Sequence, residues 1–230
     1  MKLKNKVALI TGGTSGIGKS VAIEFAKEGA EIILLGKSIK KLEEIDDEIR
    51  KYNSNGAILV KGNVKDFKAF PSLAENIFNR FKRLDILVSN AGILGELMPL
   101  QQMSEEIFND VMQTNFTANF YLIKYLYPLV KLSSNGKMIF TTCEHAVTNE
   151  AFYSIYGASK AALNAMITSF SKEIGNPNVK LHLIDPGIVD TKLRHKAMPG
   201  ENKELLLKPE NIASKFVELA CEEVVEELDY

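Results

Sequence analysis

Two short motifs combine residue types and spacings that could do chemistry. Residues 11–20 read TGGTSGIGKS, a glycine-rich turn that follows an apolar run, and residues 156–160 read YGASK at the start of a helical segment. Glycines let the backbone approach a ligand closely, and the free N–H groups at the start of a helix favour an anion. The turn therefore predicts a phosphate-binding site.

The YGASK motif predicts an acid-base pair. Tyr156 and Lys160 are four residues apart, so they share one face of a helix. A free tyrosine has a pKa of about 10, and a neighbouring cation lowers that pKa by stabilising the phenolate. A surface tyrosine beside a solvated lysine would give the same pattern, so the motif needs support from the rest of the chain.

The glycine-rich turn fits two motifs. Residues 13–20 match GxxxxGK[ST], the phosphate loop of nucleoside triphosphatases, in which Lys19 and Ser20 would contact phosphate and magnesium. A triphosphatase also needs an acidic residue at a strand end, and Asp185 is a candidate. However, no water-positioning or arginine-finger element accompanies it. The second match is TGxxxGxG, a variant of the dinucleotide fingerprint, formed by Gly12, Gly16 and Gly18.

Six short apolar runs alternate with longer amphipathic stretches that could position these motifs. The runs are KVALIT (6–11), EIILL (31–35), AILVK (57–61), DILVS (85–89), KMIFT (137–141) and VKLHLI (179–184). Near-continuous apolar runs joined by helices predict a doubly wound parallel α/β sheet. Ser38, Ser104 and Pro209 mark helix starts. The last run alternates, with Lys180 and His182 between apolar residues, which predicts an edge strand.

Composition predicts one domain over residues 1–230. The 230 residues are 46% hydrophobic and 25% charged, and 28 Lys+Arg against 29 Asp+Glu leave a net charge of −1, so we expect neither nucleic acid nor membrane partners. The two cysteines show no metal-ligand spacing, and no leader or membrane span is evident, which predicts a cytoplasmic protein without metal. The longest irregular segment, 186–208, predicts a substrate loop.

Several motifs occur together in a characteristic order. TGGTSGIG at 11–18 is followed by GNV at 62–64, NAG at 90–92, Asn115, YGASK at 156–160 and PGIVDT at 186–191. Over nearly its whole length the chain resembles the short-chain dehydrogenase/reductase family, and ILGELMPLQQ and RHKAMP resemble a little-characterised bacterial subgroup of oxidoreductases. The resemblance implies a Rossmann-type fold and hydride transfer between a nicotinamide cofactor and a carbonyl or secondary alcohol.

The resemblance also implies roles for individual residues. Tyr156 would be the acid-base, Lys160 would lower its pKa and hold the nicotinamide ribose, and Asn115 would position a water that connects Lys160 to solvent. The residues that it assigns to the cofactor are Gly12, Thr14, Ser15, Gly16, Ile17, Gly18, Lys37, Ser38, Asn63, Val64, Asn90, Ala91, Gly92, Tyr156, Lys160, Pro186, Gly187, Val189 and Thr191.

Cys143 departs from the family pattern. The family places a serine thirteen residues before the tyrosine, where it donates a hydrogen bond to the substrate oxygen, and here that position is Cys143. A thiol is a weak donor, and loss of an oxyanion donor costs roughly 10²- to 10³-fold in rate. Three interpretations remain open: a weakened dehydrogenase, a substrate that needs little help here, and a catalytically silent NADP(H)-binding protein. Thr142 could substitute only if the strand end were re-aimed, and a hydrolase built on Cys143 and His145 lacks an orienting group.

Other departures concern the adenine site, the cofactor and the oligomer. Asn63 replaces the usual aspartate, which should soften adenine recognition. Lys37 stands where an NAD-specific protein presents a carboxylate, so we predict NADP(H) over NAD(H). The chain ends after ELACEEVVEELDY without the usual seventh strand, which disfavours a tetramer and leaves a homodimer as the expectation.

The sequence does not identify the small-molecule carbonyl or alcohol substrate. The resemblance nominates as its walls Ile93, Leu94, Glu144, His145, Tyr153, Val189 and residues 192–207. Within that last range, the basic residues 192 and 194–196 are interpreted as a solvated face, with contact to an anionic substrate or carrier as the alternative.

Overall fold

Six apolar segments pair side by side as parallel strands in the computed structural model, which describes residues 1–148 and 150–222. The strands are β1 (Val7–Thr11), β2 (Glu31–Gly36), β3 (Ala57–Lys61), β4 (Ile86–Ser89), β5 (Gly136–Thr141) and β6 (Val179–Ile184). Their order is β3-β2-β1-β4-β5-β6, so the direction of winding reverses between β1 and β4. The predicted doubly wound, single-domain α/β fold is confirmed, and every strand begins and ends within one residue of its apolar run.

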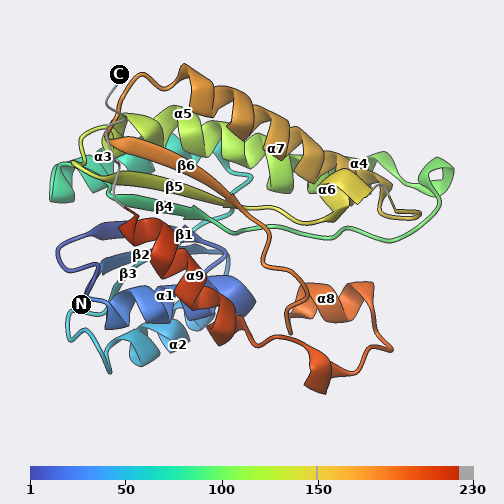
Figure 1. Ribbon diagram of the computed structural model, residues 1–230, viewed down its shortest axis with the longest axis horizontal. Helices are drawn as coiled ribbons and strands as arrows, with labels where there is room; N and C mark the ends of the chain where they lie inside the picture. Colours follow the sequence, from blue (N-terminus) through green and yellow to red (C-terminus); the bar gives the residue numbers. More distant parts are fainter. Residues whose placement is uncertain (149, 223–230) are drawn as a thin grey trace, which may run out of the picture.

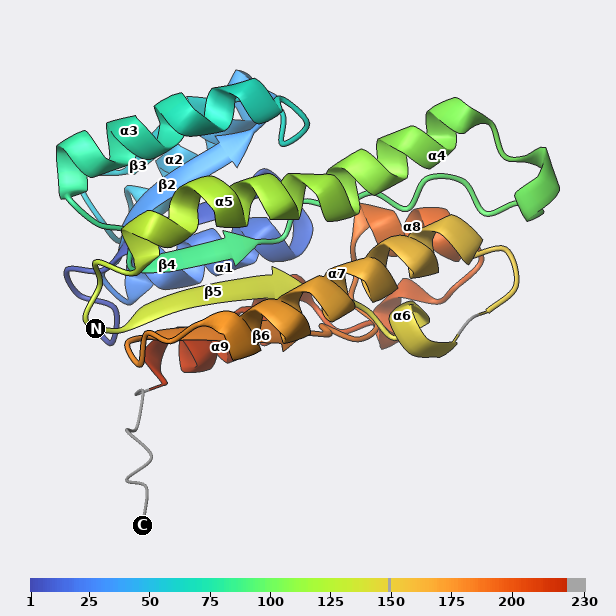
Figure 2. The ribbon, with the colours of Figure 1, turned by 90° about the horizontal axis from the view of Figure 1, so that it is seen from above.

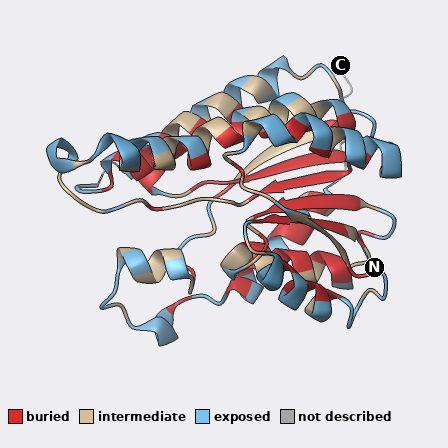
Figure 3. Ribbon diagram, turned by 180° about the vertical axis from the view of Figure 1, so that it is seen from behind, coloured by how far each residue is buried: buried red, intermediate tan, exposed pale blue. Residues whose placement is uncertain are grey.

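Two layers of helices cover the two faces of the sheet (Figures 1 and 3). One layer contains α1 (Gly16–Lys27), α2 (Ile39–Ile49) and α9 (Pro209–Cys221), and the other contains α3 (Phe70–Phe81), α5 (Ala118–Val130) and α7 (Ser154–Glu173). Each layer packs on its own cluster of buried side chains, with Phe25 and Phe216 in the first and Phe70 and Phe140 in the second. The four central strands, β1, β2, β4 and β5, are buried on both faces, which explains their near-continuous apolar sequences.

The predicted helix starts are confirmed. Ser38 caps α2 by accepting a hydrogen bond from the Lys41 N–H, and Ser104 caps α4 (Glu105–Met112) by accepting one from the Ile107 N–H. Pro209 is the first residue of α9. Between α4 and α5 the backbone forms one π-helical turn, Gln113–Thr117, which the sequence pattern did not predict.

The amino ends of the strands are joined by Asp85, whose side chain is only 1% exposed. Its carboxylate accepts hydrogen bonds from the Val7 N–H at 2.9 Å, from the Ser133 hydroxyl at 2.5 Å and from the Arg83 guanidinium at 3.0 Å. A buried carboxylate is stable only with such partners. Asp85 therefore holds β1, β4 and the segment before β5 together at the amino ends of the strands.

Three helices lie beyond the carboxyl ends of the strands (Figure 2): α4, α6 (His145–Thr148) and α8 (Lys192–Ala197). The prediction that 186–208 is irregular was partly wrong, because the segment contains α8, a 3₁₀ turn at Lys203–Leu205 and a bridge between Val189 and Leu207. β6 lies at the sheet edge, as predicted. Residues 223–230, on which the seventh-strand prediction falls, lie outside the described residues. Within the described residues, no helix is long and apolar enough to cross a bilayer.

Candidate active site

A cavity of about 500 Å³ opens at the carboxyl ends of the strands, where the winding of the sheet reverses. Ligands of doubly wound sheets bind at this point. The cavity is lined by the glycine-rich turn, by the ends of β2, β4, β5 and β6, and by residues of α7 and α8. Those predicted for the cofactor are Gly12, Thr14, Ser15, Gly16, Ile17, Lys37, Ser38, Val64, Asn90, Ala91, Gly92, Tyr156, Lys160, Pro186, Gly187, Val189 and Thr191.

The glycine-rich turn approaches its neighbours so closely that side chains are excluded. A Cβ on Gly12 would lie 2.9 Å from the Ala91 Cα, and one on Gly18 would lie 2.5 Å from the Gly12 carbonyl oxygen. Gly12 and Gly16 also have positive φ angles. The turn brings the first N–H groups of α1 to the cavity, and the capping residue Ser15 makes no side-chain cap. These features fit an anionic phosphate group.

The phosphate-loop alternative does not fit this geometry. The Lys19 ammonium lies 2.6 Å from the Glu48 carboxylate, and the Ser20 hydroxyl donates to Glu210 at 3.2 Å. Neither side chain lines the cavity. Asp185 does line it, but one of its carboxylate oxygens accepts from the Gly187 N–H at 2.8 Å. The lysine and serine that a triphosphatase would use are therefore engaged by glutamates of α2 and α9.

Cations gather where β2 ends. Lys37 and Lys41 are both exposed and both line the cavity, together with Ser38. The sequence predictions did not include Lys41, which lies in the first turn of α2, four residues after Lys37. They also missed Gly62, which lines the cavity, whereas Asn63 does not and instead accepts a hydrogen bond from the Lys65 N–H. The predicted contact of Asn63 with adenine is therefore not supported by its placement.

Tyr156 and Lys160 lie in the same cavity as the glycine-rich turn. Lys160 is 5% exposed, its ammonium donates to the Thr141 carbonyl oxygen at 2.7 Å, and burial lowers its pKa to about 8. Burial raises the pKa of Tyr156, and the neighbouring Cys143 and Asp185 raise it further. The net shift of the Tyr156 pKa is therefore upward, whereas the spacing predicts a lowering by Lys160.

Cys143 occupies the position predicted from the family pattern, at the end of β5. Burial raises the pKa of its thiol, and a hydrogen bond with Tyr156 and the charge of Lys160 offset part of that rise. The group beside the Tyr156 hydroxyl is therefore a neutral thiol at physiological pH. The Thr142 hydroxyl donates to the Asn164 side chain at 2.6 Å. Thr142 is thus already engaged and does not replace the missing serine.

Asn115 lies in the π-helical turn and is completely buried. Its side-chain oxygen accepts from the Ile93 N–H at 2.9 Å, and its amide donates to the Ile93 carbonyl at 2.9 Å and to the Ser159 hydroxyl at 3.0 Å. Asn115 does not itself line the cavity, so this side chain holds the segment after β4 against α7. Its neighbour Thr114 does line the cavity, and the Thr114 hydroxyl has no hydrogen-bond partner among the described residues. Sequence analysis missed Thr114.

The segment that carries α8 closes one side of the cavity. Arg194 forms two hydrogen bonds with the Glu201 carboxylate, at 2.6 and 2.7 Å, and Lys196 donates to the Gly95 carbonyl at 2.5 Å. Asp190 is bonded to both His195 and Lys208 at 2.7 Å. The interpretation of the basic residues as a solvated face was therefore incomplete, because Lys192 and Arg194 line the cavity.

No three His, Cys, Asp or Glu side chains in the described part of the chain are grouped to hold a metal ion. The site thus consists of a glycine-rich turn at the switch point of the sheet and a buried tyrosine-lysine pair in one cavity. Together with the fold, it defines the class of Rossmann-type dinucleotide-binding oxidoreductases.

Comparison with known proteins identifies the family. The family model described as short chain dehydrogenase matches residues 6–202, and the chain belongs to this oxidoreductase family. It is 31% identical to the uncharacterized oxidoreductase YciK of Escherichia coli K12 over 94% of this chain and 86% of that protein. It is 29% identical to the 3-oxoacyl-[acyl-carrier-protein] reductase FabG of Thermotoga maritima over 97% and 93%.

Two solved structures share the fold of this chain. A short chain dehydrogenase from Escherichia coli CFT073, complexed with NADPH, is 30% identical, covers 95% of this chain and 91% of its own, and superposes with a TM-score of 0.91. A second one, from Shigella flexneri 2a, was solved with NADP and also has a TM-score of 0.91, with 30% identity and coverage of 95% and 92%.

Proposed function

We propose that the protein is an NADP(H)-dependent oxidoreductase that interconverts a carbonyl group and a secondary alcohol. The observation that carries this proposal is the presence of Tyr156 and Lys160 in the cavity that the glycine-rich turn also lines. When bound, the nicotinamide cofactor supplies or accepts the hydride. The protein then has to bind the phosphates, orient the carbonyl and handle one proton.

Tyr156 is the proposed acid-base. Because burial raises its pKa, the hydroxyl is protonated at neutral pH and can donate its proton to a carbonyl oxygen that is being reduced. Lys160, the only lysine in α7 that lines the cavity among the described residues, stands one helical turn away and provides positive charge beside the resulting phenolate. Cys143 is the proposed second donor to the same oxygen, and a weak one.

Lys37 and Lys41 support the preference for NADP(H). A 2′-phosphate on the adenine ribose carries negative charge, and two exposed lysines at the end of β2 offer charge-assisted hydrogen bonds to it. The acidic residues that line the cavity are Glu144 and Asp185, and both lie beyond β5 or β6 rather than at β2. The relatives solved with NADP and NADPH agree with this assignment.

A second candidate function follows from Cys143. If the thiol fails to stabilise the substrate oxygen, the chain would bind NADP(H) with little or no turnover. This alternative shares the cofactor site and differs only in activity.

The first test compares the thermal shifts produced by NADPH, NADH and Mg-ATP, because a ligand that binds only the native state stabilises it by RT ln(1 + [L]/Kd). We expect the largest shift with NADPH. A shift with Mg-ATP alone would contradict the proposal. NADPH oxidation is then followed with a panel of ketones, for which Tyr156→Phe should reduce turnover by about 10²- to 10⁴-fold while the NADPH shift is retained. Tight NADPH binding without turnover of any ketone would favour the silent alternative.

A homodimer and a cytoplasmic location remain predictions from the sequence. Light scattering of the purified protein at several concentrations tests the first, with a mass twice that of one chain as the expected result.

A further inference from the structure

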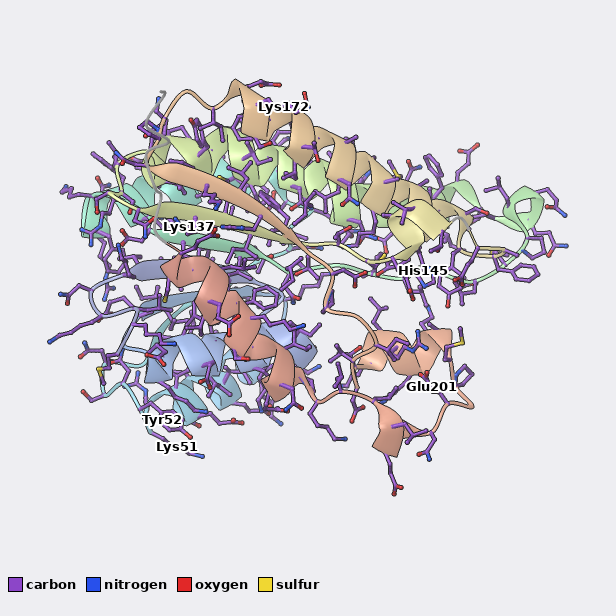
Figure 4. The ribbon with its side chains drawn as sticks, in the orientation of Figure 1. Lys51, Tyr52, Lys137, His145, Lys172 and Glu201 are labelled. Carbon is purple, nitrogen blue, oxygen red and sulfur yellow. The ribbon has the colours of Figure 1, made fainter. Side chains whose placement is uncertain are left out.

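The half of the cavity next to Tyr156 contains a stacked aromatic pair, His145 and Tyr153. His145 is the first residue of α6 and Tyr153 directly precedes α7, and their ring centroids lie 3.9 Å apart with planes inclined by 21°. Both side chains are buried and both line the cavity. Figure 4 shows His145 at α6, above the segment that carries α8 and Glu201. The pair is therefore a packed part of the cavity wall beside the proposed acid-base.

Each ring of this pair carries a buried polar atom that lacks a hydrogen-bond partner among the described residues. These atoms are the Tyr153 hydroxyl oxygen and the His145 Nδ1. The Glu150 carboxylate lies 3.6 Å from Nδ1, which is beyond hydrogen-bond distance. A buried polar group without a partner destabilises the folded protein. Two unpaired groups side by side in a ligand cavity indicate that the ligand supplies the partner.

The surroundings of the pair favour an uncharged partner. Arg194 lies close enough to influence Tyr153, but its guanidinium is neutralised by two hydrogen bonds to Glu201. Lys196 donates to a backbone carbonyl, and Lys192 is exposed. Leu94, Leu193 and Ala197 pack against Tyr153 and Tyr156. The carboxylates of Glu144 and Glu150 also act on Tyr153, which disfavours an anionic partner. Such walls bind an apolar body, and one neutral polar group completes the pair.

The pair lies close to the point of reaction. The ring centroid of Tyr156 is 6.5 Å from that of Tyr153 and 6.2 Å from that of His145. A substrate whose carbonyl meets the Tyr156 hydroxyl can therefore reach the pair with an atom only a few bonds away.

We propose that His145 and Tyr153 bind a second, uncharged oxygen of the substrate, so that the enzyme acts on apolar ketones with a hydroxyl group one or two carbons from the reacting carbonyl. This inference rests on the proposed function, because it takes Tyr156 as the acid-base. Tyr153 and His145 are its specificity-determining residues.

The test uses three neutral ketones that share a phenyl ring: acetophenone, 2-hydroxyacetophenone and 3-hydroxy-1-phenylpropan-1-one. With NADPH, we expect kcat/KM for at least one hydroxyketone to exceed that for acetophenone by about 10- to 100-fold, because only the hydroxyketones satisfy the buried pair. Tyr153→Phe keeps the stacked ring and removes only the hydroxyl. It should lower the ratio of kcat/KM for the favoured hydroxyketone to kcat/KM for acetophenone by about 10-fold or more.

Two controls make the result specific. Tyr125→Phe removes a tyrosine hydroxyl from α5, outside the cavity, and should leave the ratio of kcat/KM for the hydroxyketone to that for acetophenone unchanged. Benzoylformate carries a carboxylate in place of the hydroxymethyl group of 2-hydroxyacetophenone. A preference for benzoylformate over both hydroxyketones would overturn the proposal, since the subsite would then take an anion through Arg194 or Lys192. A hydroxyketone preference that survives in both Tyr153→Phe and His145→Phe would also overturn it.

A binding measurement separates this proposal from the proposed function. In the presence of saturating NADPH, the favoured hydroxyketone should raise Tm more than acetophenone does, and Tyr153→Phe should abolish the difference. If this pattern is observed and no ketone is reduced, the reductase proposal fails and the subsite stands. If all three ketones are reduced with equal efficiency and bind equally, the subsite fails and the reductase stands.

Discussion

Cys143 and Tyr156 share one side of the cavity, and their contact affects both groups. The pKa of Tyr156 is raised by burial and further by the thiol, while burial raises the pKa of the thiol itself. Both groups are therefore protonated at neutral pH, which suits donation to a substrate oxygen in the direction of reduction. The thiol remains the weaker of the two donors.

Replacement of Cys143 by serine tests how far the thiol limits the reaction. A hydroxyl at this position is a stronger donor to the substrate oxygen, so Cys143→Ser should raise kcat for ketone reduction by about 10- to 100-fold. Steady-state NADPH oxidation measures the change. Cys221→Ser, at the end of α9 and outside the cavity, is the matched control. An unchanged or lower rate for Cys143→Ser would show that the thiol does not limit catalysis.

If the Lys37 ammonium binds the 2′-phosphate, this residue determines the preference for NADPH over NADH. Lys37→Glu should weaken NADPH binding by about 10-fold or more and leave NADH binding equal or improved, because the new carboxylate repels phosphate and can accept from a ribose hydroxyl. Titration of cofactor fluorescence measures both affinities. Lys40→Glu is the matched control, since Lys40 in the first turn of α2 is also exposed but does not line the cavity. Equal effects of the two substitutions would indicate general electrostatics instead of a specific contact.

At the scale of elements, the glycine-rich turn is held by backbone contacts that only glycine permits. A Cβ on Gly18 would lie 2.5 Å from the Gly12 carbonyl and 2.7 Å from the Asn90 amide nitrogen. α1 thus packs directly on the turn that it follows, and the Asn90–Gly92 segment closes over both. The position of the phosphate site depends on this packing.

Gly18→Ala should therefore disturb α1 and the phosphate site together. We expect a lower Tm and a reduced NADPH-induced thermal shift, because the backbone must move to accommodate the methyl group. Gly175→Ala is the control, since a Cβ there meets nothing within 4 Å. A normal NADPH shift in a destabilised Gly18→Ala protein would show that the packing supports the fold alone.

The edge strand β6 carries a pH-sensitive group. Burial lowers the pKa of His182 from 6.5 to about 4, although the Glu222 carboxylate opposes this and Lys180 and Lys137 reinforce it (Lys137 is labelled in Figure 4). Between pH 6.5 and 4 the unfolded chain binds a proton that the folded chain does not, so this histidine reduces stability as the pH falls through that window. The Tm of His182→Leu should fall less between pH 7 and pH 5 than that of the wild type, as measured by calorimetry. An identical decrease would contradict this role.

Sequence analysis predicted elements well where their signals are local. Apolar runs locate the strands, and Ser38 and Ser104 mark helix starts, because these patterns reflect burial and capping of neighbouring residues. The π-helical turn at Asn115 was not predictable, since it depends on hydrogen bonds to Ile93 and Ser159, which are distant in sequence. The match of Lys19 to a phosphate loop was misleading for the same reason, because Glu48 engages it from another helix.

The whole molecule consists of two helical layers on one sheet, and α9 completes the layer that contains α1. Phe216 of α9 is fully buried among residues of that layer. The cavity draws on segments from Gly12 to Ala197, so its shape requires that both layers hold the sheet. Stability and site geometry are thus linked through packing far from the cavity.

Phe216→Ala should cost about 3–5 kcal/mol in the free energy of unfolding, because it removes a large side chain from a packed core and leaves a cavity. Chemical denaturation measures this free energy. Phe78→Ala is the control, since Phe78 on α3 is 42% exposed and should lose much less. Similar losses for both variants would argue against a continuous core beneath α9.

The amino and carboxyl ends of the strands have different roles. At the amino ends, the buried Asp85 carboxylate joins β1, β4 and the segment before β5 through interior hydrogen bonds. The segments that form the cavity follow the carboxyl ends of the strands and are not part of that junction. Substitutions in α8 and its flanking loops can therefore reshape the cavity wall without loosening this junction, so the part of the site away from the glycine-rich turn is the part most open to redesign by directed evolution.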